Sequence, residues 1–449
     1  TDESWSVKLA EEWEPNSVPI DSGRFQEIYD SRKKPVGWNV VGFDDSDWAA
    51  PAICDGLPQR LKARQIPPLR ERYVHPKQVI DVGRVISTSG PSPDVASQIC
   101  AESVESSPAA IKYPKEMLTV SGEAAVVSPN GDSYVVLDFG AETVGYPCLR
   151  TRGGGQGIVD IGYSEILDAN GRVWPTRGGM LQADRLVLHG GRQEWQAFGR
   201  RVFRYVQLTF RSVESPIYVE SVSAVASGYP VEQVSTFECS DDLLNRIWQT
   251  GVYTLNLCMQ DKYECRPGSP EEDAEATRLQ ALFNNHCFFD AALAADALES
   301  DQSGCLSWLQ MLHDYHLYTG DLALVQQLYP RVEEVLDRQA ADLVDDRLDC
   351  IYRHAKLVVA SRLARIVSST EDAARWHHEA EELKQKWNDH FWCRAASIAH
   401  QEGAEWFERV QSALLETGLD IVDGGKLDEA WGLLNPSELA SVPPRRLFY

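Results

Sequence analysis

Positive charge is scarce in this 449-residue chain, which has 43 Lys and Arg residues against 67 Asp and Glu residues. The formal net charge of −24 disfavours nucleic acid as a partner, because phosphate binding depends on clustered Lys and Arg. The same charge repels the anionic surface of a membrane. Long apolar runs are also missing: even the stretch 351–364 contains Arg and Lys, so we expect no transmembrane helix.

Cysteine patterns typical of metal sites are absent as well. The ten cysteines include no Cys-x-x-Cys pair and no matching histidine spacing, so the sequence predicts no metal site and indicates no cofactor. There is also no Asn-x-Ser/Thr sequon with an allowed middle residue. The first residue is Thr rather than Met, which favours a processed, secreted chain, although without a sequon the compartment stays open.

The first half of the sequence is rich in β-strand signals. Its β-branched and aromatic segments of strand length are separated by turn signals such as Asn170-Gly171. These segments are residues 134–139, 158–163, 185–189 and 203–210. They predict an antiparallel β-sandwich over 133–234. The residues before it divide into a partial β module at 1–86 and a Ser-, Pro- and Ala-rich insertion or flexible loop at 87–132.

In the second half, apolar residues recur with the period of an α-helix. From residue 240 onward, apolar residues such as Leu244, Ile247 and Val252 recur about every 3.6 positions. Ser240 is the expected N-cap of the first helix, because two aspartates that favour a helix N-terminus follow it. About eight or nine such segments are joined by short loops. We therefore expect residues 235–449 to form an all-α domain.

Short motifs near the junction of the two halves are more specific than these periods. The junction motifs are 237–248 (FECSDDLLNRIW), 261–265 (DKYEC) and 277–283 (TRLQALF). The upstream motifs are 43–48 (FDDSDW), 138–145 (DFGAETVG), 163–167 (YSEIL) and 203–206 (FRYV). In this order they resemble the α-L-rhamnosidase family of six-hairpin glycosidases, with 1–86 similar to its carbohydrate-binding-type module. The resemblance implies a jelly-roll-like β-sandwich followed by an (α/α)6-type toroid, here incomplete, with a pocket at one end of the inner helices.

The segment that carries the general acid in that family is altered here. Inverting hydrolases need one carboxylic acid to protonate the leaving oxygen and a second carboxylate to activate water. The family's acid segment resembles Asp-Cys-Pro-x-x-Glu, and an ungapped alignment on Cys265 and Thr277 places Ser269 at the acid position. A slip of two residues brings Glu271 there instead. The alternative for the acidic run 271–273 is a first helical turn, where the helix dipole favours negative charge.

The second carboxylate has no evident position. The resembling family has twelve helices, more than the periodicity indicates here, and its base comes late in the toroid. Four glutamates in the C-terminal region lie in helix-like polar patterns typical of solvated faces. They are Glu405, Glu408, Glu416 and Glu429. The resemblance thus implies the shell of a glycosidase with a degenerate catalytic motif.

A pocket without its acids would be richer in aromatic side chains, which suits an apolar small molecule. Our leading hypothesis is a glycosidase-derived enzyme of secondary metabolism that orients such a molecule for a cyclisation or a cycloaddition of hetero-Diels–Alder type. The candidate catalytic residues are His313, His316, Arg266 and, for hydrolysis, Glu271. The candidate substrate-binding residues are Tyr263, Glu264, Ser269, Glu272, Asp273, Trp308, Tyr315, Trp387, Phe391 and Trp392.

Two other functions stay open from the sequence. The first is an α-L-rhamnosidase with Glu271 as a displaced acid, and the second is a non-catalytic carbohydrate-binding protein. The histidines also have a plainer explanation, because His313 and His316 lie three apart on an amphipathic helix and a satisfied core histidine is common there. A small molecule is the partner that the sequence indicates, and the oligomeric state is left open.

Overall fold

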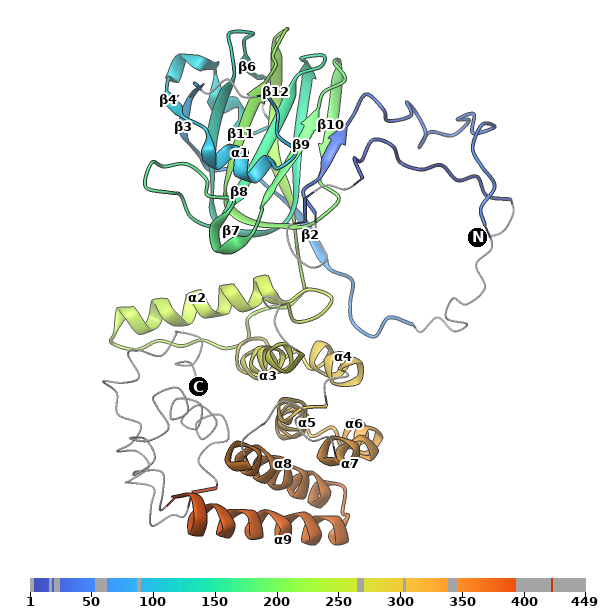
Figure 1. Ribbon diagram of the computed structural model, residues 1–449, viewed down its shortest axis with the longest axis vertical. Coiled ribbons are helices and arrows are strands. Elements are labelled where there is room, and N and C mark those ends of the chain that lie inside the picture. Colours follow the sequence, from blue (N-terminus) through green and yellow to red (C-terminus); the bar gives the residue numbers. More distant parts are fainter. Residues whose placement is uncertain are drawn as a thin grey trace. The chain divides into compact units, whose positions relative to one another are not determined.

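The computed structural model describes residues 4–15, 18–19, 25–52, 63–86, 90–120, 122–264, 270–301, 304–337, 346–392 and 421–422. The chain divides into two compact units, Thr1–Pro230 and Val231–Tyr449. The first, which we call the β unit, consists mainly of strands, and the second, the helical unit, consists of helices (Figure 1). A β-rich half followed by an α-helical half is what the two sequence periods predict, with the boundary four residues earlier than expected.

The described residues of the β unit form twelve strands in one hydrogen-bonded network. The strands are β1 (Ile28–Asp30), β2 (Arg70–Val74), β3 (Gln78–Val85), β4 (Val104–Ser106), β5 (Ile111–Lys112), β6 (Ala125–Val127), β7 (Ser133–Gly153), β8 (Ile158–Ser164), β9 (Ala183–Val187), β10 (Arg192–Gln196), β11 (Arg201–Arg211) and β12 (Ile217–Gly228). One α-helix, α1 (Val95–Ala101), and three short 3-10 helices complete the described part of the unit.

The long strand β7 organises this network. Its first half pairs with β3 and β11, whereas its second half pairs with β10 and β12. The main path of the sheet runs β1-β9-β8-β11-β7-β12-β6-β5. These pairs are antiparallel except β1 with β9, which is parallel. A strand shared in this way joins the two layers of a sandwich.

Both faces of the first part of β7 are buried, which explains the apolar run at 134–137. Val135 and Leu137 point into the main core of the sandwich. Tyr134 and Val136 point the other way and pack with Ile99 of α1 in a second, smaller core. An isolated two-layer sheet would expose that second face, so α1 acts as its cover.

The domain boundaries predicted inside the β unit differ from the structure. Residues 1–86 do not form a module of their own, because β1 pairs with β9 and β3 pairs with β7. Residues 87–132 are not a simple insertion or flexible loop, because they supply α1, three short strands and buried side chains such as Met117. Their Ser, Pro and Ala content gave no sign of this, since a few apolar residues at the right positions suffice to anchor a segment.

Buried ion pairs fasten the N-terminal segment to the sandwich. The carboxylate of Asp184 accepts hydrogen bonds from Arg201 at 2.6 and 3.0 Å and from the Tyr163 hydroxyl at 2.8 Å. Arg201 also contacts Glu27, whose carboxylate accepts the backbone N–H groups of residues 198 and 199. Burial, and then repulsion by Asp184, raises the pKa of Glu27. The chain before β1 is therefore held by charge as well as by strand pairing.

The helical unit has eight α-helices in its described residues. They are α2 (Asp242–Cys258), α3 (Pro270–Cys287), α4 (Ala292–Ser300), α5 (Leu306–Thr319), α6 (Leu322–Leu328), α7 (Pro330–Asp337), α8 (Asp346–Ile366) and α9 (Thr370–Lys386), followed by a π-helical turn, η4 (Trp387–Trp392). The N-cap of α2 is Asp241 rather than the predicted Ser240, because the Asp241 side chain accepts the N–H groups of Leu243 and Leu244. Among the described helices, none combines the length and apolar character that crossing a bilayer requires.

The helices α3, α5, α8 and α9 pack one against the next in this unit. The helix α5 lies between α3 and α8, and α8 packs along α9 (Figure 1). Leu309 and Leu312 of α5 and Ile351 and Ala360 of α8 are fully buried. The apolar stripe predicted for α2 is not covered in the same way, because Leu244 and Ile247 are 46% and 54% exposed. The helix α3, at whose beginning the family's acid segment is expected, packs against α5.

One buried histidine makes the helical unit sensitive to acid. His354 of α8 is 2% exposed, and burial, assisted by Lys384, lowers its pKa to about 4. The unfolded chain takes up this proton near pH 6.5 and the folded chain only near pH 4, so stability is lost as the pH falls through this window. We expect a loss of about 2–3 kcal/mol between pH 7 and pH 4, which His354→Gln largely removes.

Urea unfolding followed by helical circular dichroism at several pH values measures this loss. His378→Gln is the matched control, because the His378 side chain is 76% exposed beside Glu382. We expect this substitution to leave the loss of stability between pH 7 and pH 4 unchanged. Equal acid sensitivity of the wild type and His354→Gln would contradict the prediction.

Candidate functional site

The turn that leads into α3 carries two of the predicted substrate-binding residues. Tyr263 is buried, and its hydroxyl accepts a hydrogen bond from the Asn284 amide at 2.8 Å. The backbone N–H of Glu264 bonds to the Cys258 carbonyl at 2.8 Å, and its carbonyl accepts from Gln280 at 3.2 Å. The turn is thus tied to the end of α2 and to the second half of α3.

The acidic run of the altered motif lies at the start of α3. This helix begins at Pro270, so Glu271, Glu272 and Asp273 belong to its first turn, as the alternative based on the helix dipole predicts. The sequence here is typical of a helix N-terminus. Proline occupies the first helical position, Ser269 directly precedes it, and Glu272 follows three residues after that serine. Arg266 and Ser269 themselves lie outside the described residues.

The two candidate histidines of α5 have different surroundings. The Nδ1 atom of His313 lies 3.8 Å from Oδ1 of Asp314. Oδ2 of Asp314 accepts a hydrogen bond from Nε of Arg278 in α3 at 3.2 Å and forms an ion pair with a terminal nitrogen of the same guanidinium at 3.1 Å. The Nδ1 atom of His316 lies 3.4 Å from the backbone oxygen of Asp321 instead. The two histidines therefore contact different residues and do not form one cluster.

Tyr315 also contacts the connection to α6. Its hydroxyl donates to the Asp321 carboxylate at 3.1 Å, and the same carboxylate caps α6 by accepting the N–H groups of Ala323 and Leu324. Burial, and then the hydrogen bond to Asp321, raises the pKa of Tyr315 to about 12. Tyr315 and His316, near the end of α5, thus both contact Asp321, the residue that caps α6.

Two of the predicted aromatic residues lie in the helical core. Trp308 is 1% exposed, its indole N–H donates to the Leu298 carbonyl at 3.0 Å, and the Arg331 guanidinium lies over its ring. Trp387 is buried to the same degree in η4. The backbone of η4 also includes Phe391 and Trp392, whose side chains lie outside the described residues. Direct contact of these aromatics with a substrate remains a prediction.

A polar cluster that the sequence analysis did not single out lies in the β unit. Arg204 donates to both carboxylate oxygens of Asp138 at 2.9 Å. Burial, and then repulsion by Glu165, raises the pKa of the nearby Glu142 to about 7, with Arg204 opposing the shift. A carboxyl group that is half protonated at neutral pH is suited to proton transfer. Both glutamates belong to family-like motifs, but nothing in those motifs signals a shifted pKa.

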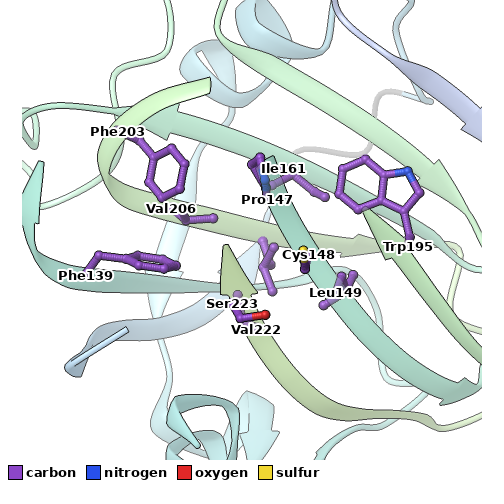
Figure 2. Close-up of a pocket in the computed structure, with 11 residues that line it drawn as sticks. Phe139, Pro147, Cys148, Leu149, Ile161, Trp195, Phe203, Val206, Val222 and Ser223 are labelled. Atoms are coloured by element: carbon purple, nitrogen blue, oxygen red, sulfur yellow. The ribbon is translucent and has the colours of Figure 1, made fainter. Parts of the chain in front are cut away.

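A cavity described in the β unit is too small for a ligand. It has a volume of about 10 Å³, which is room for about one water molecule. Figure 2 shows that its lining comes from the core of the sandwich, with Phe139, Trp195 and Phe203 around it. The gap is therefore a packing defect between strands, and it does not provide the substrate pocket expected at the end of the helices. In the described part of the chain, no group of three His, Cys, Asp or Glu side chains is arranged to hold a metal ion.

Comparison with known proteins identifies the relatives of this chain. The family model for the bacterial alpha-L-rhamnosidase concanavalin-like domain matches residues 129–226. The chain is 22% identical over 298 residues to an alpha-L-rhamnosidase of Formosa agariphila, covering 63% of this chain. It spans only 25% of the length of that relative.

Solved structures show the same fold. A GH78 family rhamnosidase of Bacillus sp. GL1 superposes with a TM-score of 0.80 at 16% identity, covering 99% of this chain and 70% of its own. The alpha-L-rhamnosidase of Aspergillus terreus gives a TM-score of 0.61 at 17% identity, covering 97% of this chain and 50% of its own. The chain is therefore rhamnosidase-like: its residues 129–226 match the concanavalin-like domain of that family, and it has the β-sandwich and helical fold of the GH78 rhamnosidases.

Proposed function

We propose that this chain is a glycosidase-derived enzyme that no longer hydrolyses glycosides and instead orients an apolar small molecule for a cyclisation or cycloaddition. The observation that carries the proposal is the start of α3 at Pro270. Ser269, aligned with the family's acid, directly precedes this helix, and Glu271 falls in its first turn. Negative charge is favoured at a helix N-terminus, whereas a general acid has to hold a proton.

A cycloaddition fits a site without an acid and a base. In a hetero-Diels–Alder step two σ bonds form from π electrons, and no atom is added or lost. Orientation of the reacting ends supplies most of the rate gain, and one hydrogen-bond donor aimed at a carbonyl oxygen lowers the barrier further. Among the predicted polar residues, His313 and Arg266 remain candidates for that contact, because Tyr315 and His316 already contact Asp321.

The second candidate function is α-L-rhamnoside hydrolysis with Glu271 as the acid. The family match over 129–226 and the names of the relatives favour it. It requires a second carboxylate opposite Glu271 across the pocket, about 6.5–9.5 Å away.

Hydrolysis of 4-nitrophenyl α-L-rhamnoside separates the two functions. Our proposal expects no release of nitrophenol above the buffer rate, and the matched variant Glu271→Gln gives the same rate as the wild type. Turnover by the wild type that Glu271→Gln abolishes would overturn the proposal in favour of hydrolysis. Tight binding of L-rhamnose without turnover, measured by calorimetry, would instead favour a carbohydrate-binding protein.

A positive test uses a reactive model diene. An o-quinone methide is generated in the assay buffer together with a cyclic alkene, and the enantiomeric excess of the adduct is measured by chiral chromatography. We expect one enantiomer in excess with the folded protein and a racemic adduct with heat-unfolded protein. A racemic adduct in both samples contradicts the proposed cycloaddition.

A further inference from the structure

The first helix of the helical unit, α2, exposes an apolar face. Leu243 is 54% exposed, Leu244 is 46% exposed and Ile247 is 54% exposed. Residues three and four positions apart are neighbours on a helix surface, so these side chains lie on one side of α2. Gly251 is the next position on that side, and a Cβ atom added there would have no atom within 4 Å. We call these four residues the α2 face.

Aromatic side chains extend the α2 face. Phe237 is 41% exposed, and its ring centroid lies 5.7 Å from that of Trp248, which follows Leu244 by one helical turn. The helix is anchored by another side, which buries Val252 and Leu255. Single exposed apolar residues are ordinary, but a contiguous patch of them is typical of a surface that another polypeptide covers.

The α2 face is acidic at the end where the helix begins. Glu238, Asp241 and Asp242 are exposed there, and Arg246 is the only basic residue of α2. A peptide that complements the face therefore carries cations next to apolar side chains. A second copy of the chain fits less well, because its net charge of −24 opposes close approach.

Residues 445–449 (RRLFY) of this chain have the required chemistry, because two arginines directly precede three apolar or aromatic side chains. They lie outside the described residues. We propose that this segment docks on the α2 face, with its arginines toward Asp241 and Asp242 and its aromatic side chains over Ile247 and Gly251. The inference is independent of the reaction proposed above, since it concerns the surface of the helical unit.

The point from which this segment is tethered lies in the helical unit. Ile421 and Val422 are buried, and the Ile421 carbonyl accepts a hydrogen bond from the Asn388 amide at 2.9 Å. The 22 residues of 423–444 extend up to about 70 Å. A compact unit of the size of 231–449 has a radius of gyration of only about 17 Å, so the α2 face is within reach. The tether also raises the effective concentration to the mM range, which allows a weak contact of five residues to form.

Trypsin cleavage after Arg446 measures the docking, because the protease cuts the undocked segment. The full chain is digested briefly, and the released peptide 447–449 is quantified by mass spectrometry. We expect the double variant Leu244→Ala, Ile247→Ala to release this peptide at least about 5-fold faster than the wild type. The matched control is Leu317→Ala in α5, whose side chain is 64% exposed, and it keeps the wild-type rate.

A change in the segment itself gives a second test that leaves α2 intact. Phe448→Ala is compared with a synthetic peptide of residues 443–449 that carries the same substitution, so that the intrinsic cleavage rate cancels. The wild type is compared with the unsubstituted peptide in the same way. We expect the wild type to be cleaved more slowly than its peptide and Phe448→Ala to lose most of this protection.

Three outcomes overturn the inference. The first is cleavage of the wild type as fast as the synthetic peptide, which means that the segment is not docked. The second is protection that the Leu244→Ala, Ile247→Ala variant retains, which means that the segment docks elsewhere. The third is a wild-type dimer, seen by light scattering, that the same variant converts to a monomer without a change in peptide release. That result would assign the α2 face to a second copy of the chain.

Discussion

Replacement of Asp160 by Asn destabilises the β unit by about 3–5 kcal/mol, the cost of leaving a buried charge without its partner. Asp160 lies in β8 with no exposed surface and accepts hydrogen bonds from Arg185 at 2.6 and 2.8 Å and from Arg211 at 2.5 Å. Both arginines are themselves buried. Asparagine has the same shape but no charge, and its NH2 group cannot accept the arginine hydrogen bonds that one carboxylate oxygen accepts, so the loss combines the missing charge with a lost acceptor.

The effect is measured by urea unfolding of the wild type and Asp160→Asn. Glu194→Gln is the matched control, because its ion pair with Arg150 lies at the surface of the same sheet and is worth at most about 1 kcal/mol. If Asp160→Asn does not fold, Arg185→Met gives the milder comparison, since Asp160 then keeps Arg211. A change in Asp160→Asn no larger than in Glu194→Gln would refute the expectation.

The strands of the β unit could be predicted from the sequence because burial dictates their composition. The apolar runs in 133–234 contribute to the main core of the sandwich. The predicted segments at 134–139 and 203–210 fall within β7 and β11. Residues 87–132 could not be predicted in the same way. The residues that anchor this segment are single apolar side chains such as Ile99, spaced among Ser, Pro and Ala. Their burial depends on packing against the sheet, which the local sequence does not reveal.

The candidate site was less predictable. The helical period indicates which face of its helix a residue lies on, but not which residue of another helix it contacts. The three-residue spacing of His313 and His316 predicted that they share a helix, and this is confirmed. It could not predict that Arg278 of α3 would hold Asp314, or that Asp321 would meet Tyr315. Contacts between helices depend on tertiary packing, which a single sequence does not encode in its period.

Trp308→Ala is the second change with a large expected effect, and it concerns a residue first predicted to bind substrate. Its ring fills the core between α4 and α5, and its N–H satisfies the Leu298 carbonyl. Truncation leaves a cavity and an unpaired buried carbonyl, so we expect a loss of about 3–5 kcal/mol. Trp308→Phe keeps most of the volume and loses the hydrogen bond, with an expected loss of about 1–2 kcal/mol.

The two variants together separate a core role from a binding role. Unfolding of each is followed in urea, and enantiomeric excess in the cycloaddition assay is followed with the folded protein. A core residue makes stability fall in the order wild type, Trp308→Phe, Trp308→Ala, while the excess obtained with Trp308→Phe stays close to the wild-type value. Unchanged stability in Trp308→Phe with loss of the excess would place the indole at the substrate instead. Because the Arg331 guanidinium lies 4.5 Å over the ring, the stability order also depends on retaining an aromatic face, which Phe supplies and Ala does not.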